Sequence, residues 1–222
     1  MSANATILST KKLSVAQKEL LLNAGIGVVA YSAIEIEILD ISGTYTSPIA
    51  NAIFTSKNAV KAIQNTDIII DVCFCVGENT KKLLEENGQK VVETAKNASD
   101  LGKIIAKKHK TEQFSFFCGN IRRDELPAIL KENDIHLEEK VVYKTHIKTR
   151  KLNRNFDGVF FFSPSGVQSY FSNNVIGTGT AFCIGNTTAS EIKKYTNNII
   201  VANKPTVENV IVQAVKYFDK RI

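Results

Sequence analysis

Short apolar runs alternate with amphipathic helical stretches along most of the 222 residues, and this alternation constrains the fold more than any other feature. An apolar run at 5–9 precedes a helical pattern at 15–25 and a second apolar run at 26–31, which is the order of a βαβ unit. The same alternation recurs from 49 to 133 and from 158 to 218. It predicts an α/β fold with parallel sheets and right-handed crossovers.

Two stretches break the alternation. IEIEILDIS at 34–42 alternates apolar with acidic residues, and KVVYKTHIKTRK at 140–151 alternates apolar with basic residues, as half-exposed strands do. We interpret them as linker strands that cross between two domains and pair antiparallel in a two-stranded β-ladder, with opposite charges facing one another. The predicted domains are then a discontinuous one, 1–33 with 152–222, and an inserted one, 43–139.

The two halves of the sequence repeat two motifs at almost the same spacing. FTSKNAV, which starts at residue 54, aligns with FFSPSGV at an offset of 107 residues, and CVGENT aligns with CIGNTT at an offset of 108. Such an echo indicates two similar parallel-sheet α/β domains. We expect a ligand cleft between these domains.

Charge and composition narrow the class of protein. Lys and Arg outnumber Asp and Glu by 28 to 22, which favours an anionic partner without naming one. The basic residues between Lys140 and Arg154 alternate along a predicted strand with few aromatic residues, so we interpret them as a solvated face and expect no nucleic acid. No coiled-coil seam is present, so a monomer is expected.

Cysteine placement and hydropathy indicate a cytoplasmic protein without a membrane partner. Four cysteines lie in or beside apolar runs, as reduced core thiols do, and three histidines form no metal-ligand spacing, so no metal site is expected. No run reaches the roughly 18 apolar residues of a membrane span. The opening MSANATILST lacks the pattern of a signal peptide.

Polar loops follow the predicted strands, at the position where open parallel sheets bind ligands and where helix N-termini offer unpaired N–H groups. In the first half these candidate binding residues are Thr55, Ser56, Lys57, Asn58, Gly77, Asn79, Thr80, Cys118, Gly119 and Asn120. Arg123 belongs to the same polar loop as Asn120. In the second half they are Ser163, Pro164, Ser165, Gly166, Gly185, Asn186, Thr187, Thr188, Asn203, Pro205 and Thr206.

Each loop taken alone is better explained by N-capping, which satisfies backbone donors and contributes about 1 kcal/mol. Capping does not require the glycine that precedes the cap in three of the loops, whereas close approach of a ligand to the backbone does. The set of loops therefore favours an anion site, such as one for several carboxylates.

Several catalytic and cofactor signatures are absent. The sequence has no GxxxxGK[ST] motif, and the close glycines of GTGTAFCIG precede a strand where a dinucleotide site needs a helix. Ser165 lacks the preceding glycine of a G-x-S-x-G elbow. Tyr143 is either a packing residue of a β-ladder or a weak acid and hydrogen-bond donor that faces the cleft.

Seven motifs in order resemble landmarks of the uroporphyrinogen-III synthase family, and they span nearly the whole chain. They are FTSKNAV, CVGENT, CGNIRRDELP, VVYKT, FFSPSGVQSYF, CIGNTTASEI and ANKPTVENVI. The resemblance implies two α/β domains joined by a two-stranded β-ladder. It also implies a cofactor-free, cyclising dehydration of the polycarboxylate hydroxymethylbilane to uroporphyrinogen III, with inversion of ring D.

The resemblance also implies roles for individual residues. Tyr143 matches the family tyrosine that assists departure of the substrate hydroxyl, and Thr188 lies in the loop grouped with it. Ser56, Ser163 and the loops at Gly77 and Gly185 match carboxylate-binding positions. Two alternatives remain open: a non-catalytic two-domain module for anion binding or sensing, and a phosphate- or sugar-binding transferase with similar loops.

Overall fold

The computed structural model describes residues 5–45 and 47–219. The chain forms two compact units: unit 1 contains the residues up to Glu35 and those from His146 onward, and unit 2 is Ile36–Thr145. The domain and linker bounds inferred from the sequence, and a cleft between the domains, stay predictions. The parts of those ranges that fall on 1–4, 46 and 220–222 lie outside the described residues.

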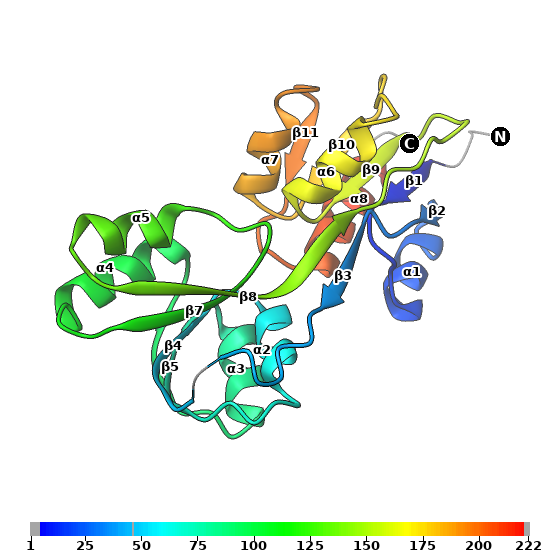
Figure 1. The fold of residues 1–222 in the computed structure, drawn as a ribbon. Helices are drawn as coiled ribbons and strands as arrows, with labels where there is room; N and C mark the ends of the chain where they lie inside the picture. The colour runs from blue at the N-terminus through cyan, green and yellow to red at the C-terminus, as the bar shows by residue number, and fades with distance from the viewer. Residues whose placement is uncertain (1–4, 46, 220–222) are drawn as a thin grey trace. The chain divides into compact units, whose positions relative to one another are not determined.

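Unit 1 contains a five-stranded sheet in the order β11-β10-β9-β1-β2, and each of its pairs of neighbouring strands is parallel (Figure 1). Its elements are β1 (Thr6–Ser9), α1 (Val15–Leu22), β2 (Gly27–Ala30), β9 (Gly158–Phe161), α6 (Pro164–Phe171), β10 (Thr180–Cys183), α7 (Asn186–Ile192), β11 (Ile199–Val201) and α8 (Val207–Asp219). The prediction of a parallel α/β fold is confirmed here.

The phenylalanines of β9 pack against helices on both faces of this sheet. Successive side chains of a strand point to opposite faces. Phe160 packs in a cluster with residues of α1 and α8, whereas Phe161 packs in another with residues of α6 and α7. A strand buried on both faces is continuously apolar, as β9 is.

Unit 2 is built in the same way around a six-stranded sheet in the order β3-β8-β7-β4-β5-β6. Its elements are β3 (Ile34–Ile38, which begins in unit 1), β4 (Ile49–Phe54), α2 (Lys57–Ile63), β5 (Ile70–Val76), α3 (Glu78–Glu86), β6 (Val91–Ala95), α4 (Ala98–Lys108), β7 (Phe114–Gly119), α5 (Glu125–Glu132) and β8 (Leu137–Ile147, which ends in unit 1). Figure 1 shows α2 and α3 on one side of these strands and α4 and α5 on the other.

The strand β8 differs from the predicted 140–151. It starts earlier because Leu137 already pairs parallel with Phe114 of β7, and it ends at Ile147. It also lies beside β3, where the Leu39 N–H donates to the Val142 carbonyl and the Lys148 N–H donates to the Ala33 carbonyl, partners that run in opposite directions. The role of these strands as a linker stays a prediction.

Lys140 corrects one expectation from the charge pattern. It belongs to the basic stretch interpreted as a solvated face, yet it is only 4% exposed. Its Nζ donates to Glu138 at 2.7 Å and lies 4.5 Å from the centre of the Tyr45 ring. The loop after β3 therefore covers this lysine, and a buried ammonium needs such partners.

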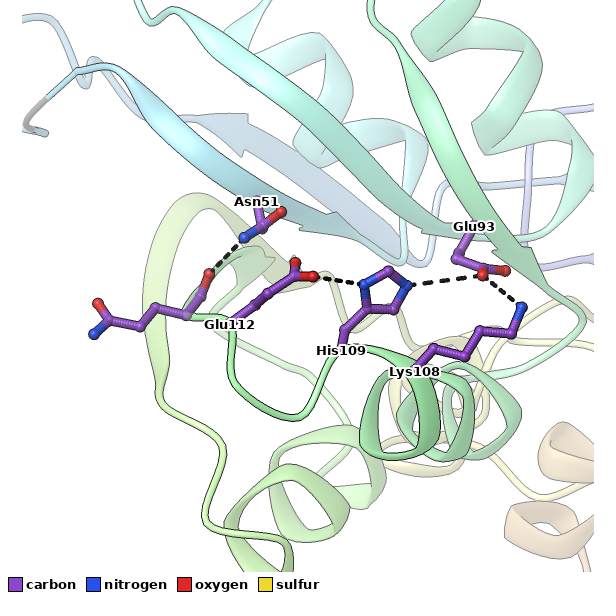
Figure 2. A network of polar contacts seen from close by, with 6 residues as sticks. Asn51, Glu93, Lys108, His109 and Glu112 are labelled. Carbon is purple, nitrogen blue, oxygen red and sulfur yellow. Dashed lines mark hydrogen bonds and ion pairs between the residues drawn. The ribbon is translucent and has the colours of Figure 1, made fainter.

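Polar contacts around His109 fasten the C-terminal end of α4 to its surroundings (Figure 2). Nδ1 of His109 lies 2.8 Å from a carboxylate oxygen of Glu112. Nε2 faces Glu93 of β6 at 3.8 Å, and Glu93 accepts a hydrogen bond from Lys108 at 2.8 Å. The imidazole also packs edge-on against Phe74 of β5. These contacts connect α4 with two neighbouring strands.

Among the described residues, no helix combines the length and the apolar character needed to cross a membrane.

Candidate functional site

A cavity in unit 2 lies at the point where the winding of the sheet changes direction. From β4 the chain continues to β5 and β6 on one side, whereas β7 continues to β8 on the other. Open α/β sheets bind ligands beyond the carboxyl ends of the strands at such a switch point. The cavity has a volume of about 400 Å³, within the usual range for small-molecule sites. Its lining consists of Thr55, Ser56, Val76, Lys96, Asn97, Ala98, Phe116, Cys118, Gly119, Ile121, Arg122, Arg123, Leu126 and Tyr143.

Five residues predicted from the sequence line this cavity: Thr55 and Ser56 after β4, Cys118 and Gly119 at the end of β7, and Tyr143 of β8. The other predicted residues of unit 2 do not line it; these are Lys57, Asn58, Gly77, Asn79, Thr80 and Asn120.

The lining also contains residues that the sequence prediction missed. Lys96, Asn97 and Ala98 follow β6, so they occupy the same position relative to a strand as the predicted loops. Applying the rule for strand ends to the apolar run KVVE would have found them. The sequence prediction also omits Arg122, whereas it places Arg123 in the polar loop that follows the strand ending at Gly119.

The two adjacent arginines differ in their partners. Arg122 donates from Nε and Nη2 to the carboxylate of Glu139 at 2.5 and 2.6 Å, and from Nη1 to Asp124. Arg123 has one distant contact, 4.0 Å from Glu125, and its side chain is about half exposed. None of the described lining residues is acidic. The positive charge that this wall offers a ligand therefore comes from Lys96, which has no ion pair with the described residues, and from Arg123, whose ion pair with Glu125 is long and exposed.

Tyr143 lies in a tight contact with Gly119. The two residues are register partners between β7 and β8, next to a register shift at Cys118 and Gly119. A Cβ at Gly119 would be 2.5 Å from Cε2 and Cζ of the tyrosine ring and 2.9 Å from its hydroxyl oxygen. The ring is 8% exposed, and no residue in the described ranges 5–45 and 47–219 forms a hydrogen bond with its hydroxyl. Glycine therefore lets the phenol lie at the cavity wall with its hydroxyl available.

Asn120, the predicted residue that follows β7, uses its side chain and its backbone in hydrogen bonds within unit 2. The side-chain oxygen of Asn120 accepts from the Thr145 N–H at 2.7 Å, and the Asn120 N–H donates to the Tyr143 carbonyl at 3.2 Å.

Burial raises the pKa of the Cys118 thiol to about 11, with a smaller contribution from the Glu139 charge. Cys118 therefore stays protonated at neutral pH, so it contributes an uncharged thiol to the cavity.

The helix caps separate the predicted loops into two kinds. Ser56, Ser163 and Thr206 accept hydrogen bonds from the backbone of the helix that each precedes, at 3.1 to 3.2 Å. Capping therefore accounts for these side chains. Gly77 and Gly185 are the N-cap residues that precede α3 and α7, and neither has a side chain that could accept a hydrogen bond. The first N–H groups of these two helices therefore remain available as donors.

The two glycines differ in why they are glycine. Gly77 has a φ of +84°, in the left-handed region that favours glycine. Gly185 has an extended backbone with φ −179°, and a Cβ there would meet no atom within 4 Å. Neither its conformation nor its neighbours in the described structure require glycine at 185.

The remaining predicted residues are placed as follows. Thr80 and Thr188 are buried at 5% and 3% exposure, in the first turns of α3 and α7. The Asn203 N–H donates to the side chain of Asn209 at 2.8 Å. Gly166 is buried, Asn58, Pro164 and Ser165 are half-buried, and Lys57, Asn79, Asn186, Thr187 and Pro205 are exposed.

Comparisons with known proteins show to which family the chain belongs. The model of the family described as uroporphyrinogen-III synthase HemD matches residues 16–211. The chain belongs to this family. The porphyrin biosynthesis protein HemD of Ruminiclostridium josui is 27% identical over 150 residues, which are 61% of this chain and 30% of that protein. The match therefore spans less than a third of this relative's length.

Solved structures of uroporphyrinogen-III synthases share the fold. The protein from Helicobacter pylori is 20% identical and superposes with a TM-score of 0.70, over 97% of this chain and 100% of that one. A mutant from the extremely thermophilic bacterium Thermus thermophilus is 12% identical, with a TM-score of 0.69 over 98% of this chain and 100% of that one. The mixed α/β architecture with mostly parallel sheets is thus that of the synthase family.

Proposed function

We propose that this protein is a uroporphyrinogen-III synthase, a lyase that cyclises hydroxymethylbilane to uroporphyrinogen III with loss of water and inversion of ring D. The observation that carries this proposal is the family match over residues 16–211. The unit 2 cavity fits an anionic substrate, because its described lining offers Lys96 and Arg123 without any carboxylate.

The reaction implied by the family demands positioning more than strong acids or bases. Departure of the terminal hydroxyl as water gives an azafulvene, which attacks the substituted position of ring D. The resulting spiro intermediate fragments and recloses with that ring inverted. Since direct closure without ring inversion is a competing outcome, the enzyme has to hold one conformation and stabilise developing charge.

We assign the protonation of the departing hydroxyl to Tyr143. Its phenol lies at the wall of the cavity, and the described residues give the hydroxyl no partner that would compete for its proton. A neutral phenol can donate a hydrogen bond to a leaving oxygen, and general acid catalysis of this kind contributes roughly 10²–10⁴-fold. Thr188 is buried, so its proposed contribution is to the shape of the first turn of α7.

Carboxylates of the substrate are proposed to contact backbone more than side chains at the predicted loops. Ser56 and Ser163 already use their hydroxyl oxygens as helix caps. The uncapped N–H groups after Gly77 and Gly185 are available, and backbone donors of this type favour anions. The cytoplasmic location and the monomeric state expected from the sequence remain part of this proposal.

The experiment that tests the function is identification of the product. Hydroxymethylbilane is generated in situ, the protein is added, and the oxidised uroporphyrin isomers are separated by chromatography. The proposal predicts mainly the type III isomer. Type I alone, formed at the rate of the protein-free control by a folded sample, contradicts it and favours the non-catalytic binding module.

A further inference from the structure

A second cavity lies wholly in unit 1, at the carboxyl ends of β1 and β2 and against the segment that follows β8. Its volume is about 580 Å³. Its lining residues are Lys12, Ala30, Tyr31, Ser32, Ile34, Glu35, Lys148, Thr149 and Arg150. No residue predicted from the sequence as a binding residue is among them.

The charges that line this cavity do not balance. It has three basic residues and one acidic residue, and the acidic one, Glu35, forms an ion pair with Lys148 at 2.7 Å. Lys12 and Arg150 have no ion-pair partner within the described parts of the chain. Two positive charges therefore face this space without a counter-charge, which favours an anion.

The segment 148–152 that carries Arg150 is in neither a helix nor a strand, yet hydrogen bonds fix its backbone at four atoms, the first being the Lys148 N–H, which donates to the Ala33 carbonyl at 2.9 Å. Ser169 of α6, which is fully buried, donates its hydroxyl to the Lys148 carbonyl. The amide of Asn174 donates to the Arg150 carbonyl at 2.7 Å and accepts from the Leu152 N–H at 2.8 Å. Fixing this backbone in advance reduces the entropy that ligand binding would cost.

The buried lining residue Tyr31 contributes no negative charge to this cavity. Tyr31 is 7% exposed, and its hydroxyl lies 3.2 Å from the Ser169 hydroxyl. Because Ser169 gives its proton to the Lys148 carbonyl, Tyr31 is the donor in this pair. Burial raises the pKa of Tyr31, so its phenol stays neutral.

We propose that this cavity binds a carboxylate group, held by the guanidinium of Arg150 and approached by the ammonium of Lys12. A guanidinium presents two parallel N–H groups that match the two oxygens of a carboxylate. That the carboxylate is one of those on the tetrapyrrole substrate rests on the proposed function. The fixed segment 148–152 makes Arg150 a specificity-determining residue.

The test is a fluorescence titration with uroporphyrin III, the oxidised product with its carboxylates intact, so that binding is measured without turnover. Arg150→Gln and Lys12→Gln are each compared with Lys151→Gln, which removes one positive charge from the next residue, outside the cavity lining. We expect roughly tenfold weaker binding for Arg150→Gln and Lys12→Gln, because a hydrogen bond to a charged group is lost. Lys151→Gln is expected to change the dissociation constant less than about twofold.

Equal losses in all three variants would overturn the proposal, because a general electrostatic effect would then explain them. Absence of binding by the unaltered protein, or full binding by Arg150→Gln, would overturn it as well. The product assay keeps the two proposals apart. Formation of only the type I isomer, together with a selective loss in Arg150→Gln, leaves the carboxylate site standing and rejects the synthase.

Discussion

The ring of Tyr143 lies so close to Gly119 that a Cβ on the glycine would overlap two of its carbon atoms at 2.5 Å. Such a distance is incompatible with any side chain unless the ring moves, and the ring is almost fully buried. The position of the phenol at the cavity wall therefore depends on the missing side chain at residue 119.

Gly119→Ala is expected to destabilise the protein by about 1–3 kcal/mol, because the added methyl group overpacks the contact between β7 and β8. The measurement is the free energy of unfolding by urea. Unchanged stability would show that the ring of Tyr143 moves freely, which contradicts its assignment as a fixed group. In the background of Tyr143→Ala the same substitution should cost less, since the clashing ring is gone, and this cycle isolates the pair.

This contact also shows where sequence reasoning ends. The motif CGNIRRDELP marked Gly119 and the motif VVYKT marked Tyr143, and both residues do line one cavity. Because the two residues lie far apart in the sequence, the sequence does not show that the missing side chain at Gly119 makes room for the ring of Tyr143. Likewise CVGENT and CIGNTT look alike, yet only Gly77 has a backbone that favours glycine.

Gly185→Ala separates the two explanations for the glycine in the second of these motifs. A Cβ at this position meets no atom within 4 Å and the backbone is extended, so the free energy of unfolding should change by less than about 1 kcal/mol. If the substrate approaches the backbone there, KM for hydroxymethylbilane should rise at least several-fold. Unchanged kinetics in a stable variant would remove Gly185 from the proposed binding residues.

The buried thiols predict a loss of stability in alkaline solution. Burial raises the pKa of Cys73 and of Cys183 from 9.0 to about 12. An unfolded thiol loses its proton near pH 9 while the folded one retains it, so their contribution to stability is full below pH 9 and is lost as pH rises toward 12. Between these two pH values, each thiol lowers the free energy of unfolding by up to about 1.4 kcal/mol for each unit that the pH rises.

The measurement is the free energy of unfolding between about pH 8 and pH 10.5, for the unaltered protein and for Cys183→Ala. The variant starts less stable because a cavity forms, but its stability should fall less steeply above about pH 9. If the free energies of unfolding of the two proteins fell equally with pH, the raised pKa of Cys183 would be contradicted. The comparison is needed because tyrosines also titrate in this range.

Secondary structure was largely predictable because its causes are local, whereas charge burial and partner choice were not. The apolar run that contains Phe160 and Phe161 specifies a strand by itself. Lys140 is covered by Tyr45, which lies far away in the sequence, and no local pattern reveals that. Arg122 and Arg123 are adjacent residues of the same type, and only the position of Glu139 shows that the guanidinium of Arg122 is paired with a carboxylate.

The central claim about the site is that the hydroxyl of Tyr143 takes part in the chemistry, and turnover of Tyr143→Phe tests it most directly. The matched control is Tyr45→Phe, which removes a hydroxyl from unit 2 that donates to the Val141 carbonyl and lies outside the cavity lining. We predict that kcat for hydroxymethylbilane falls roughly 10²-fold or more in Tyr143→Phe, with the fold intact, and stays within about twofold in Tyr45→Phe. Unchanged turnover in a folded Tyr143→Phe would contradict the account and leave Tyr143 as a packing residue of β8.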